Sequence, residues 1–108
     1  MTTHALQLNS IFGALADPTR RDILKRVGKK ELPVSEIAKP YKLTLAAISK
    51  HLKVLEEAKL IMKRRQGKQQ LVQASPVAIR DASAYLKAYE AQWNDRFDRL
   101  EAYLKSQN

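Results

Sequence analysis

Apolar residues recur at helical spacing in the first 30 positions of the chain. The first set predicts a helix over residues 6–15 and consists of Leu8, Ile11, Phe12 and Leu15. Asp17 can accept hydrogen bonds from the first amides of a second helix, and Pro18 fits its first position because the missing N–H has no partner there. This helix should run to about Lys29. Its inward side comprises Ile23, Leu24 and Val27, and its basic side is expected to face solvent.

A second pair of helices follows, joined by a tight turn. Residues 31–33 should be extended because Pro33 restricts the residue before it, and a brief helix over residues 34–39 should end at Pro40. Thr44 is a good N-cap for the next helix, residues 45–58. The buried face of that helix is expected to comprise Ile48, Leu52 and Leu55. This is the helix-turn-helix pattern, in which the second helix can enter the major groove of DNA.

After Lys59 the hydrophobic period changes to two, which predicts a β-hairpin over residues 60–73. Gly67 can supply the positive φ that a tight hairpin turn needs. Four basic residues cluster around this tip: Lys63, Arg64, Arg65 and Lys68. A basic hairpin next to a recognition helix is a wing, suited to phosphates or to the minor groove.

Pro76 opens a final helix that should run to about Lys105. Its apolar stripe has steps of three or four and comprises Ala82, Leu86, Tyr89, Trp93, Phe97, Leu100 and Leu104. A helix of roughly 30 residues spans about 45 Å, which is longer than a three-helix core of this size covers. We therefore expect the helix to pair with its copy across a two-fold axis; the alternative is that the whole stripe packs within one chain.

Together these elements predict a mostly α fold with a small β-hairpin (α+β). The fold is a winged helix-turn-helix in the order α-α-(β)-α-α-β-β-α. A chain of 108 residues is about the size of one ordinary domain. We expect a single DNA-binding domain, 1–108, whose terminal helices, about 6–15 and 76–105, form the dimerisation surface.

The formal net charge of +9 is confined to one part of the chain. Residues 1–75 hold 15 of the 20 Lys and Arg and 6 of the 11 acids, whereas residues 76–108 hold five of each. A basic region beside a neutral one indicates a polyanion-binding surface with a separate assembly element, although a basic surface kept for solubility is the alternative. RNA binding is disfavoured because five of the seven aromatic residues lie in the neutral helix, away from the positive charge.

Several classes of protein are disfavoured by what the sequence lacks. There is no cysteine, so disulfides, thiolate metal sites and a Cys nucleophile are excluded. His51 has only His4 as a possible histidine partner, and no Gly-rich phosphate loop occurs, so we predict no metal site, no cofactor and no catalytic residue. No stretch approaches the roughly 18 apolar residues of a membrane span, and residues 1–9 lack a signal-peptide pattern. A soluble cytoplasmic protein without a membrane partner is expected.

Two segments carry a family resemblance. ALADPTRRDIL (residues 14–24), followed by ISKHLKVLEEA (residues 48–58), strongly resembles the ArsR/SmtB family of bacterial winged-helix repressors. The ending WNDRFDRLEAYL (residues 93–104) looks like a non-metal-sensing branch of that family. The resemblance covers nearly the whole chain. It implies a homodimer built through the first and last helices, which binds palindromic operator DNA and usually represses transcription.

The resemblance also implies site residues. The base-reading surface falls on Leu45, Ala46, Ser49, Lys50 and His51, with Thr44 and Lys53 near phosphates, and the wing adds Arg64, Arg65 and Lys68. Family members often have polar residues or a Pro where this chain has Leu45-Ala46, so contact with a thymine methyl would replace hydrogen bonding there. The alternatives are that Leu45 packs inward and that Ser49 is an ordinary exposed residue. The dimer interface is expected to comprise Leu8, Phe12, Leu86, Tyr89, Trp93, Phe97, Leu100 and Leu104.

We therefore expect a sequence-specific regulator that binds double-stranded DNA as a homodimer and acts as a repressor on a pseudo-palindromic operator. Two alternatives remain at this point: a winged-helix module for protein interactions, and a non-specific DNA-binding protein. An inducing signal is not visible in the sequence. A small-molecule effector, a protein effector or control by expression level alone all stay open.

Overall fold

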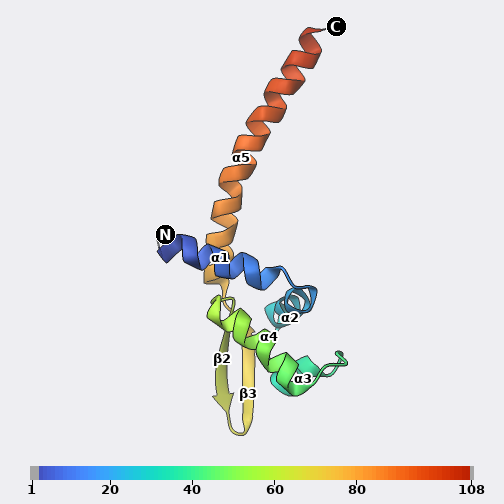
Figure 1. Ribbon diagram of the computed structural model, residues 1–108, viewed down its shortest axis with the longest axis vertical. Helices are drawn as coiled ribbons and strands as arrows, with labels where there is room; N and C mark the ends of the chain where they lie inside the picture. Colours follow the sequence, from blue (N-terminus) through green and yellow to red (C-terminus); the bar gives the residue numbers. More distant parts are fainter. Residues whose placement is uncertain (1–2, 108) are drawn as a thin grey trace.

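The computed structural model describes residues 3–107, with the side chains of residues 7–107 (Figure 1). The described residues form α1 (Thr3–Leu15), α2 (Pro18–Lys29), β1 (Leu32–Pro33), α3 (Val34–Ala38), α4 (Leu45–Glu57), β2 (Ile61–Gln66), β3 (Gln69–Ala74) and α5 (Pro76–Ser106). The predicted element order and the mostly α winged helix-turn-helix fold are confirmed. The first helix begins at Thr3, earlier than the residue 6 that the apolar pattern indicates.

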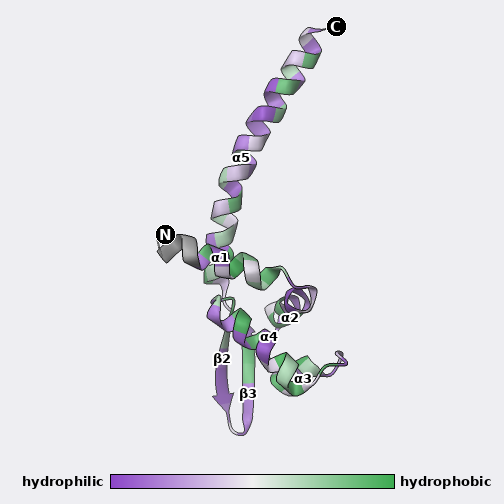
Figure 2. Cartoon of the chain, viewed as in Figure 1, coloured by the Kyte–Doolittle hydropathy of each residue, from purple (hydrophilic) through white to green (hydrophobic). Residues whose placement is uncertain are grey.

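The core lies where α1, α2, α3 and α4 meet the base of the sheet. Its fully buried side chains are Ile11, Ile23, Ile37, Ile48, Leu52, Leu55, Leu60, Ile61 and Val72. The inward face predicted for α4 is therefore confirmed, and Figure 2 shows hydrophobic and hydrophilic residues alternating along this helix. Since burying one such side chain is worth about 1.5–3 kcal/mol, this cluster fixes how α4 sits on the body.

The sheet has three antiparallel strands in the order β1-β3-β2. Gln66 pairs with Gln69, so the hairpin turn has only two residues, and Gly67 has a φ of 61°. A glycine with positive φ at this position is what such a turn requires. The extended segment before α3 is a true strand, because Leu32 pairs with Val72.

Helix α4 ends in a Schellman motif that holds the start of the wing. The Lys59 N–H donates to Glu56 O at 2.9 Å, and the Leu60 N–H donates to Leu55 O at 3.0 Å. Lys59 therefore adopts the left-handed conformation, with a φ of 61°. Glycine usually fills this position because it has no Cβ to clash with the backbone.

Three arginines on the basic side of α2 bind backbone carbonyls, although the sequence indicated a solvated face. Arg20 Nε donates to Ala14 O at 2.7 Å, and Arg21 Nη1 donates to Leu15 O at 2.7 Å. Arg26 Nη1 donates to Ile37 O at 2.9 Å. The last carbonyls of a helix lack intrahelical donors, so these side chains complete the ends of α1 and α3.

Helix α5 leaves the body of the protein and projects away from it, as Figure 1 shows. The molecule measures 68 × 32 × 21 Å, and its radius of gyration is 18.9 Å. A compact chain of this length would have a radius of gyration of about 13 Å. The prediction that the body cannot cover the whole of this helix is confirmed.

Candidate nucleic-acid interface

Helix α4 presents one face to the core and the opposite face to solvent. Leu45, Ala46, Ser49, Lys50 and Lys53 are all exposed on the outer face. Thr44 is the N-cap, and its Oγ1 accepts a hydrogen bond from the Ala47 N–H at 3.1 Å. The helix start that would meet DNA is thus fixed by a local cap.

The apolar start of this face is open to solvent. Leu45 is 66% exposed, so the alternative in which it packs inward is wrong. Leu43, which the sequence analysis did not single out, is 44% exposed on the other side of Thr44. Two exposed leucines at the tip of the helix suit contact with thymine methyl groups, since no core apolar surface covers them.

His51 is the one predicted base-reading residue that the structure turns towards the body. Its side chain is 20% exposed, and its Nδ1 lies 3.9 Å from Asp17 Oδ2 and 3.4 Å from Arg20 Nη1. The hydrogen bond from the backbone N–H of Arg20 to Asp17 is the main cause that lowers the pKa of the Asp17 carboxyl from its ordinary 3.8. Charge on the side chains of His51 and Arg20 lowers this pKa further. His51 therefore links α4 to the start of α2.

The turn before α4 is anchored to α2 by Tyr41. Its hydroxyl donates to the Asp22 carboxylate, and the Arg26 guanidinium lies 5.6 Å from its ring centroid. Burial, followed by the hydrogen bond to Asp22, raises the pKa of the Tyr41 hydroxyl above 10.0. These contacts hold the turn of the helix-turn-helix against the body, which sets the position of α4.

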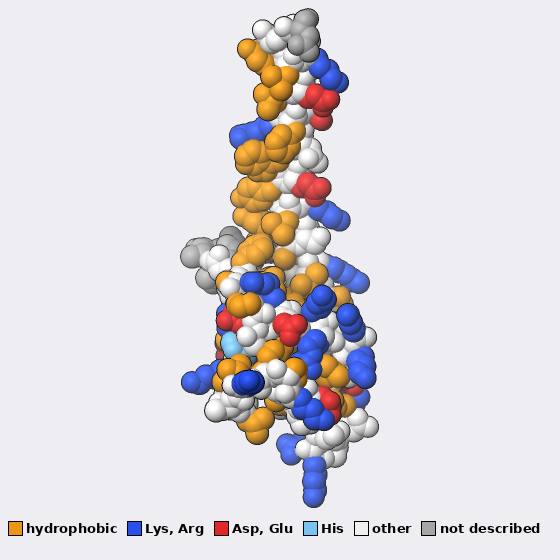
Figure 3. Space-filling view, turned by 90° about the vertical axis from the view of Figure 1, so that its right-hand side faces the viewer, with side chains coloured by type: hydrophobic (Ala, Val, Ile, Leu, Met, Phe, Trp, Pro, Cys, Tyr) orange, Lys and Arg blue, Asp and Glu red, His pale blue; other side chains and the backbone are white. Residues whose placement is uncertain are grey.

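The basic residues of the wing divide into paired and unpaired groups. Arg64 makes a bidentate pair with Glu31, and Lys63 Nζ lies 3.5 Å from Glu56 Oε1. Arg65 and Lys68 are exposed and have no ion pair among the residues that the structure describes. Figure 3 shows basic side chains over the body and at the tip of the wing. The unpaired cations at that tip are the ones best placed to meet phosphates.

Glu31, which precedes β1 and pairs with Arg64 of the wing, is a positioning residue that the sequence analysis missed. Its hydrogen bonds with Arg64 lower the pKa of the Glu31 carboxyl and raise the pKa of the Arg64 guanidinium. Only the pairing of β1 with β3 brings the two residues together, and a two-residue strand carries no periodic signal of its own. Arg64 therefore ties the wing to the body, whereas Arg65 stays free.

Most of the predicted dimer stripe is exposed along α5. Leu86, Tyr89, Trp93, Phe97, Leu100 and Leu104 are 47–59% exposed, and Figure 3 shows a stripe of hydrophobic side chains along the helix. The alternative in which the whole stripe packs within one chain is wrong. Phe12 is half-buried, and its ring centroid lies 6.0 Å from that of Tyr85. Leu8 corrects the prediction, because at 7% exposure it belongs to the core of the single chain.

The described residues contain no group of three His, Cys, Asp or Glu side chains that could hold a metal ion. The side chain of His4 lies outside the part that the structure describes. Among the described helices, none combines the length and the apolar character that crossing a membrane needs.

Comparisons with known sequences agree with this geometry. Residues 15–64 match the family described as a helix-turn-helix domain. Over 66 residues the chain is 39% identical to the HTH-type transcriptional regulator Rv2034 of Mycobacterium tuberculosis. The aligned stretch covers 61% of this chain and 62% of that protein. Over 60 residues it is 35% identical to the transcriptional repressor SdpR of Bacillus subtilis. This aligned stretch covers 56% of this chain and 67% of that protein. The match to the first relative spans less than two thirds of its length.

Solved structures share the fold over most of the chain. The crystal structure of an ArsR family transcriptional regulator has a TM-score of 0.80 at 35% identity, and the match covers 87% of this chain and 97% of that one. The homodimeric winged helix-turn-helix DNA-binding domain of Mb0332 from Mycobacterium bovis has a TM-score of 0.63 at 28% identity, covering 78% and 80%.

Proposed function

This chain belongs to the ArsR/SmtB family of winged helix-turn-helix transcriptional regulators, and on that basis we propose that it binds a pseudo-palindromic DNA operator as a homodimer and represses transcription there. The observation that carries the proposal is the outer face of α4. That face is exposed from Leu45 to Lys53 and lies on a helix whose opposite side is locked into the core. A rigid helix with one free face is what major-groove recognition needs.

The exposure and the contacts of each residue support the role that we propose for it. In this proposal the exposed residues Leu45, Ala46, Ser49 and Lys50 read the bases, with Leu43 beside them, and Thr44 and Lys53 contact phosphates. Arg65 and Lys68 place the positive charge of the wing against the phosphates of the DNA backbone. His51 and Arg64 act mainly by holding α4 and the wing in place, because each already has partners within the chain.

The homodimer is supported by the exposed stripe on α5 and by Phe12 on α1. An exposed apolar stripe of this length marks an interaction surface, because burying it against a partner removes it from water. A second copy offers an identical stripe across a two-fold axis. The Mycobacterium bovis domain of the same fold is homodimeric. Residues 1–108 then act as one domain, with the reading surface on the body and the assembly surface on α1 and α5.

Three further properties belong to the proposal. The protein works in the cytoplasm, where its DNA lies. It has no catalytic activity of its own, which fits relatives that are transcriptional regulators. Its affinity for DNA responds to an effector, a small molecule or a protein.

Selection of bound DNA from a random pool tests the proposal. We expect an inverted repeat with half-site centres about 34–36 Å apart, one turn of DNA, because two α4 helices are related by the dimer axis. A pool enriched without symmetry would contradict the dimeric assembly. A pool that is not enriched at all would contradict sequence-specific binding.

A further inference from the structure

The start of α4 carries an apolar tip, which consists of Leu43, Leu45 and Ala46 and is exposed to solvent. Among the large hydrophobic side chains that the structure describes, Leu45 is the most exposed. The tip is held in place on both sides, because Tyr41 anchors the turn before it and Thr44 caps the first turn of the helix. A fixed apolar surface with nothing of its own chain over it is available to an apolar group of the binding partner.

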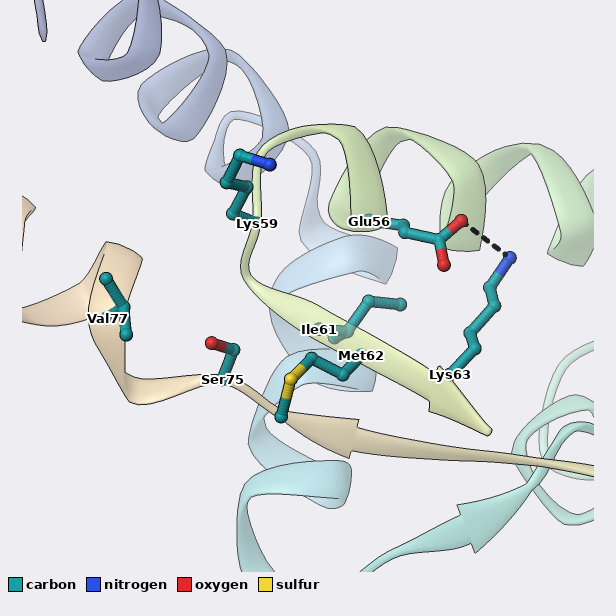
Figure 4. Close-up of a pocket in the computed structure, with 7 residues that line it drawn as sticks. All are labelled: Glu56, Lys59, Ile61, Met62, Lys63, Ser75 and Val77. Carbon is teal, nitrogen blue, oxygen red and sulfur yellow. Dashed lines mark ion pairs between the residues drawn. The ribbon is translucent and has the colours of Figure 1, made fainter. Parts of the chain in front are cut away.

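The charges beside the two ends of α4 indicate what that partner is. At the end of the helix, a groove of about 510 Å³ is flanked by Lys63 and Glu56, whose side chains pair with each other at 3.5 Å (Figure 4). At the start, Lys42 and Lys50 are exposed and have no ion pair among the residues that the structure describes. Unpaired cations beside apolar side chains match a polyanion that displays apolar groups. Double-stranded DNA is such a polymer, because thymine methyl groups line its major groove.

The apolar tip can sense only one part of a pyrimidine. In the major groove thymine presents its C5-methyl group and the O4 acceptor, whereas cytosine presents the N4 donor. Leucine and alanine side chains have no hydrogen-bonding group, so they contact the methyl group and do not read position 4. Ser49, one turn after Leu45, can donate as well as accept and therefore does not separate the two bases. Since 5-methylcytosine carries its methyl group at the same ring position as thymine, this surface should treat the two alike.

We propose that Leu43 and Leu45 determine specificity by reading the C5-methyl groups of pyrimidines in the operator. The protein accepts thymine or 5-methylcytosine at these positions and discriminates against unmethylated cytosine. Methylation of a cytosine at such a position then strengthens binding without a change of sequence. The inference rests on the proposed function, because it needs a DNA site that α4 reads, and it goes further by naming the chemical group that is read and a modification of DNA that controls affinity.

Replacement of thymine by deoxyuracil removes only the methyl group and is the first test. Each thymine of the selected inverted repeat is replaced at equivalent positions of both half-sites, and the dissociation constant of the wild-type protein is measured. Burying one methyl group is worth about fourfold in affinity, and the dimer contacts two, so we expect a loss of about tenfold at one or more positions of the half-site. A loss at no position would overturn the proposal.

Methylated cytosine is the second test. At the sensitive positions, cytosine·guanine pairs with and without the C5-methyl group replace the thymine·adenine pairs. The methylated duplex should bind about tenfold more tightly than the unmethylated one, for the same reason. The two duplexes carry the same charge, so this ratio should be equal at low and high salt, whereas both affinities fall as salt rises. Equal binding of the two duplexes would overturn the proposal.

Variants assign the methyl effect to the leucines. Leu43→Ala and Leu45→Ala should each reduce the preference for thymine over uracil, and the double variant should abolish it; both side chains are exposed, so the fold should persist. Val54→Ala is the matched control. Val54 is exposed on the same helix, but it lies nine residues, or two and a half turns, after Leu45 and therefore on the opposite side. The control should keep the full preference. An undiminished preference in the double variant would overturn the assignment to the leucines.

Failure of this inference is distinguishable from failure of the proposed function. A duplex that is bound specifically, with an affinity that no methyl group changes, would contradict the methyl reading alone. Absence of specific binding to the unmodified duplex would contradict the proposed function, and the methyl reading with it.

Discussion

Arg64 Nη2 lies 2.6 Å from Glu31 Oε1, and this contact, with a second hydrogen bond of 2.8 Å, ties the wing to the residue that precedes β1. Arg65, the next residue, points to the other side of β2 because side chains alternate along a strand. Neighbouring arginines in the sequence therefore have different tasks: Arg64 positions the wing, and Arg65 is free to meet DNA.

DNA binding should separate these two arginines. Arg65→Gln should reduce the slope of log affinity against log salt by about 1, since one phosphate contact is lost, and should weaken binding alike on all sequences. Arg64→Gln should change the slope less, because its charge is already shared with Glu31. Titrations of both variants at several salt concentrations measure this. Equal slopes would contradict the division of tasks.

The same ion pair makes stability depend on pH. The pKa of Glu31 in the folded protein lies below its ordinary 4.5, and the hydrogen bond from Arg64 is the main cause. A carboxyl whose pKa is lower in the folded protein than in the unfolded chain stabilises the fold at pH values above its ordinary pKa. That contribution is lost as the pH falls through the pKa of the folded protein. We expect Glu31→Gln to flatten the fall in the free energy of unfolding below about pH 4.5.

Arg64→Gln should reduce the loss of unfolding free energy at acidic pH in the same way as Glu31→Gln. The double variant should reduce that loss little more than either single variant does. This follows because the shift arises from the pair and not from either residue alone. Urea unfolding between neutral and acidic pH, at one fixed protein concentration, provides the measurement. An acid limb identical to that of the wild type in both single variants would show that the pair does not act in solution.

Lys59 in the left-handed conformation offers a stabilising substitution. Lys59→Gly should raise the free energy of unfolding by about 1 kcal/mol, because glycine lacks the Cβ that clashes at positive φ. Lys25→Gly is the matched control in the middle of α2, where glycine should lower the free energy of unfolding by about 1 kcal/mol. Denaturant unfolding of both variants checks the opposite signs. A loss of stability in Lys59→Gly would contradict the Schellman motif at the end of α4.

The apolar stripe on α5 should control assembly. Phe97→Asp places a charge in the stripe, whereas Ala91→Asp places the same charge about half a turn away on the polar face. Burial of a Phe side chain contributes about 1.5–3 kcal/mol, and each dimer contains two, so Phe97→Asp should raise the dimer dissociation constant by about two to four orders of magnitude. Sedimentation equilibrium measures the dissociation constants. Equal effects of the two variants would contradict a dimer interface on this stripe.

Local signals explain what the sequence predicted correctly. Asp17, Pro18 and Thr44 act within one turn of their own helices, and the steps of three and four on α5 need no knowledge of neighbours. Gly67 likewise predicts the hairpin turn, because glycine tolerates positive φ. These features gave the element order and the exposed face of α4.

Contacts between distant segments explain the rest. Arg64 and Glu31 are 33 residues apart in the sequence, and the arginines of α2 reach carbonyls on other elements, so neither contact has a periodic trace. Leu8 and Phe12 lie on one helical face, but only packing decides that Leu8 is buried and Phe12 half-exposed. Lys59 gave no sign of its conformation because the residue type is not the one that favours it.

The central claim is that the free face of α4 and the unpaired cations of the wing recognise one DNA sequence. The most direct test is the ratio of dissociation constants for the selected inverted repeat and for a scrambled duplex of equal length, measured at the same physiological salt concentration. We expect the inverted repeat to bind about 10³-fold more tightly or better, the usual range for specific recognition. Equal affinity for the two duplexes would contradict the claim, because charge alone would then explain binding.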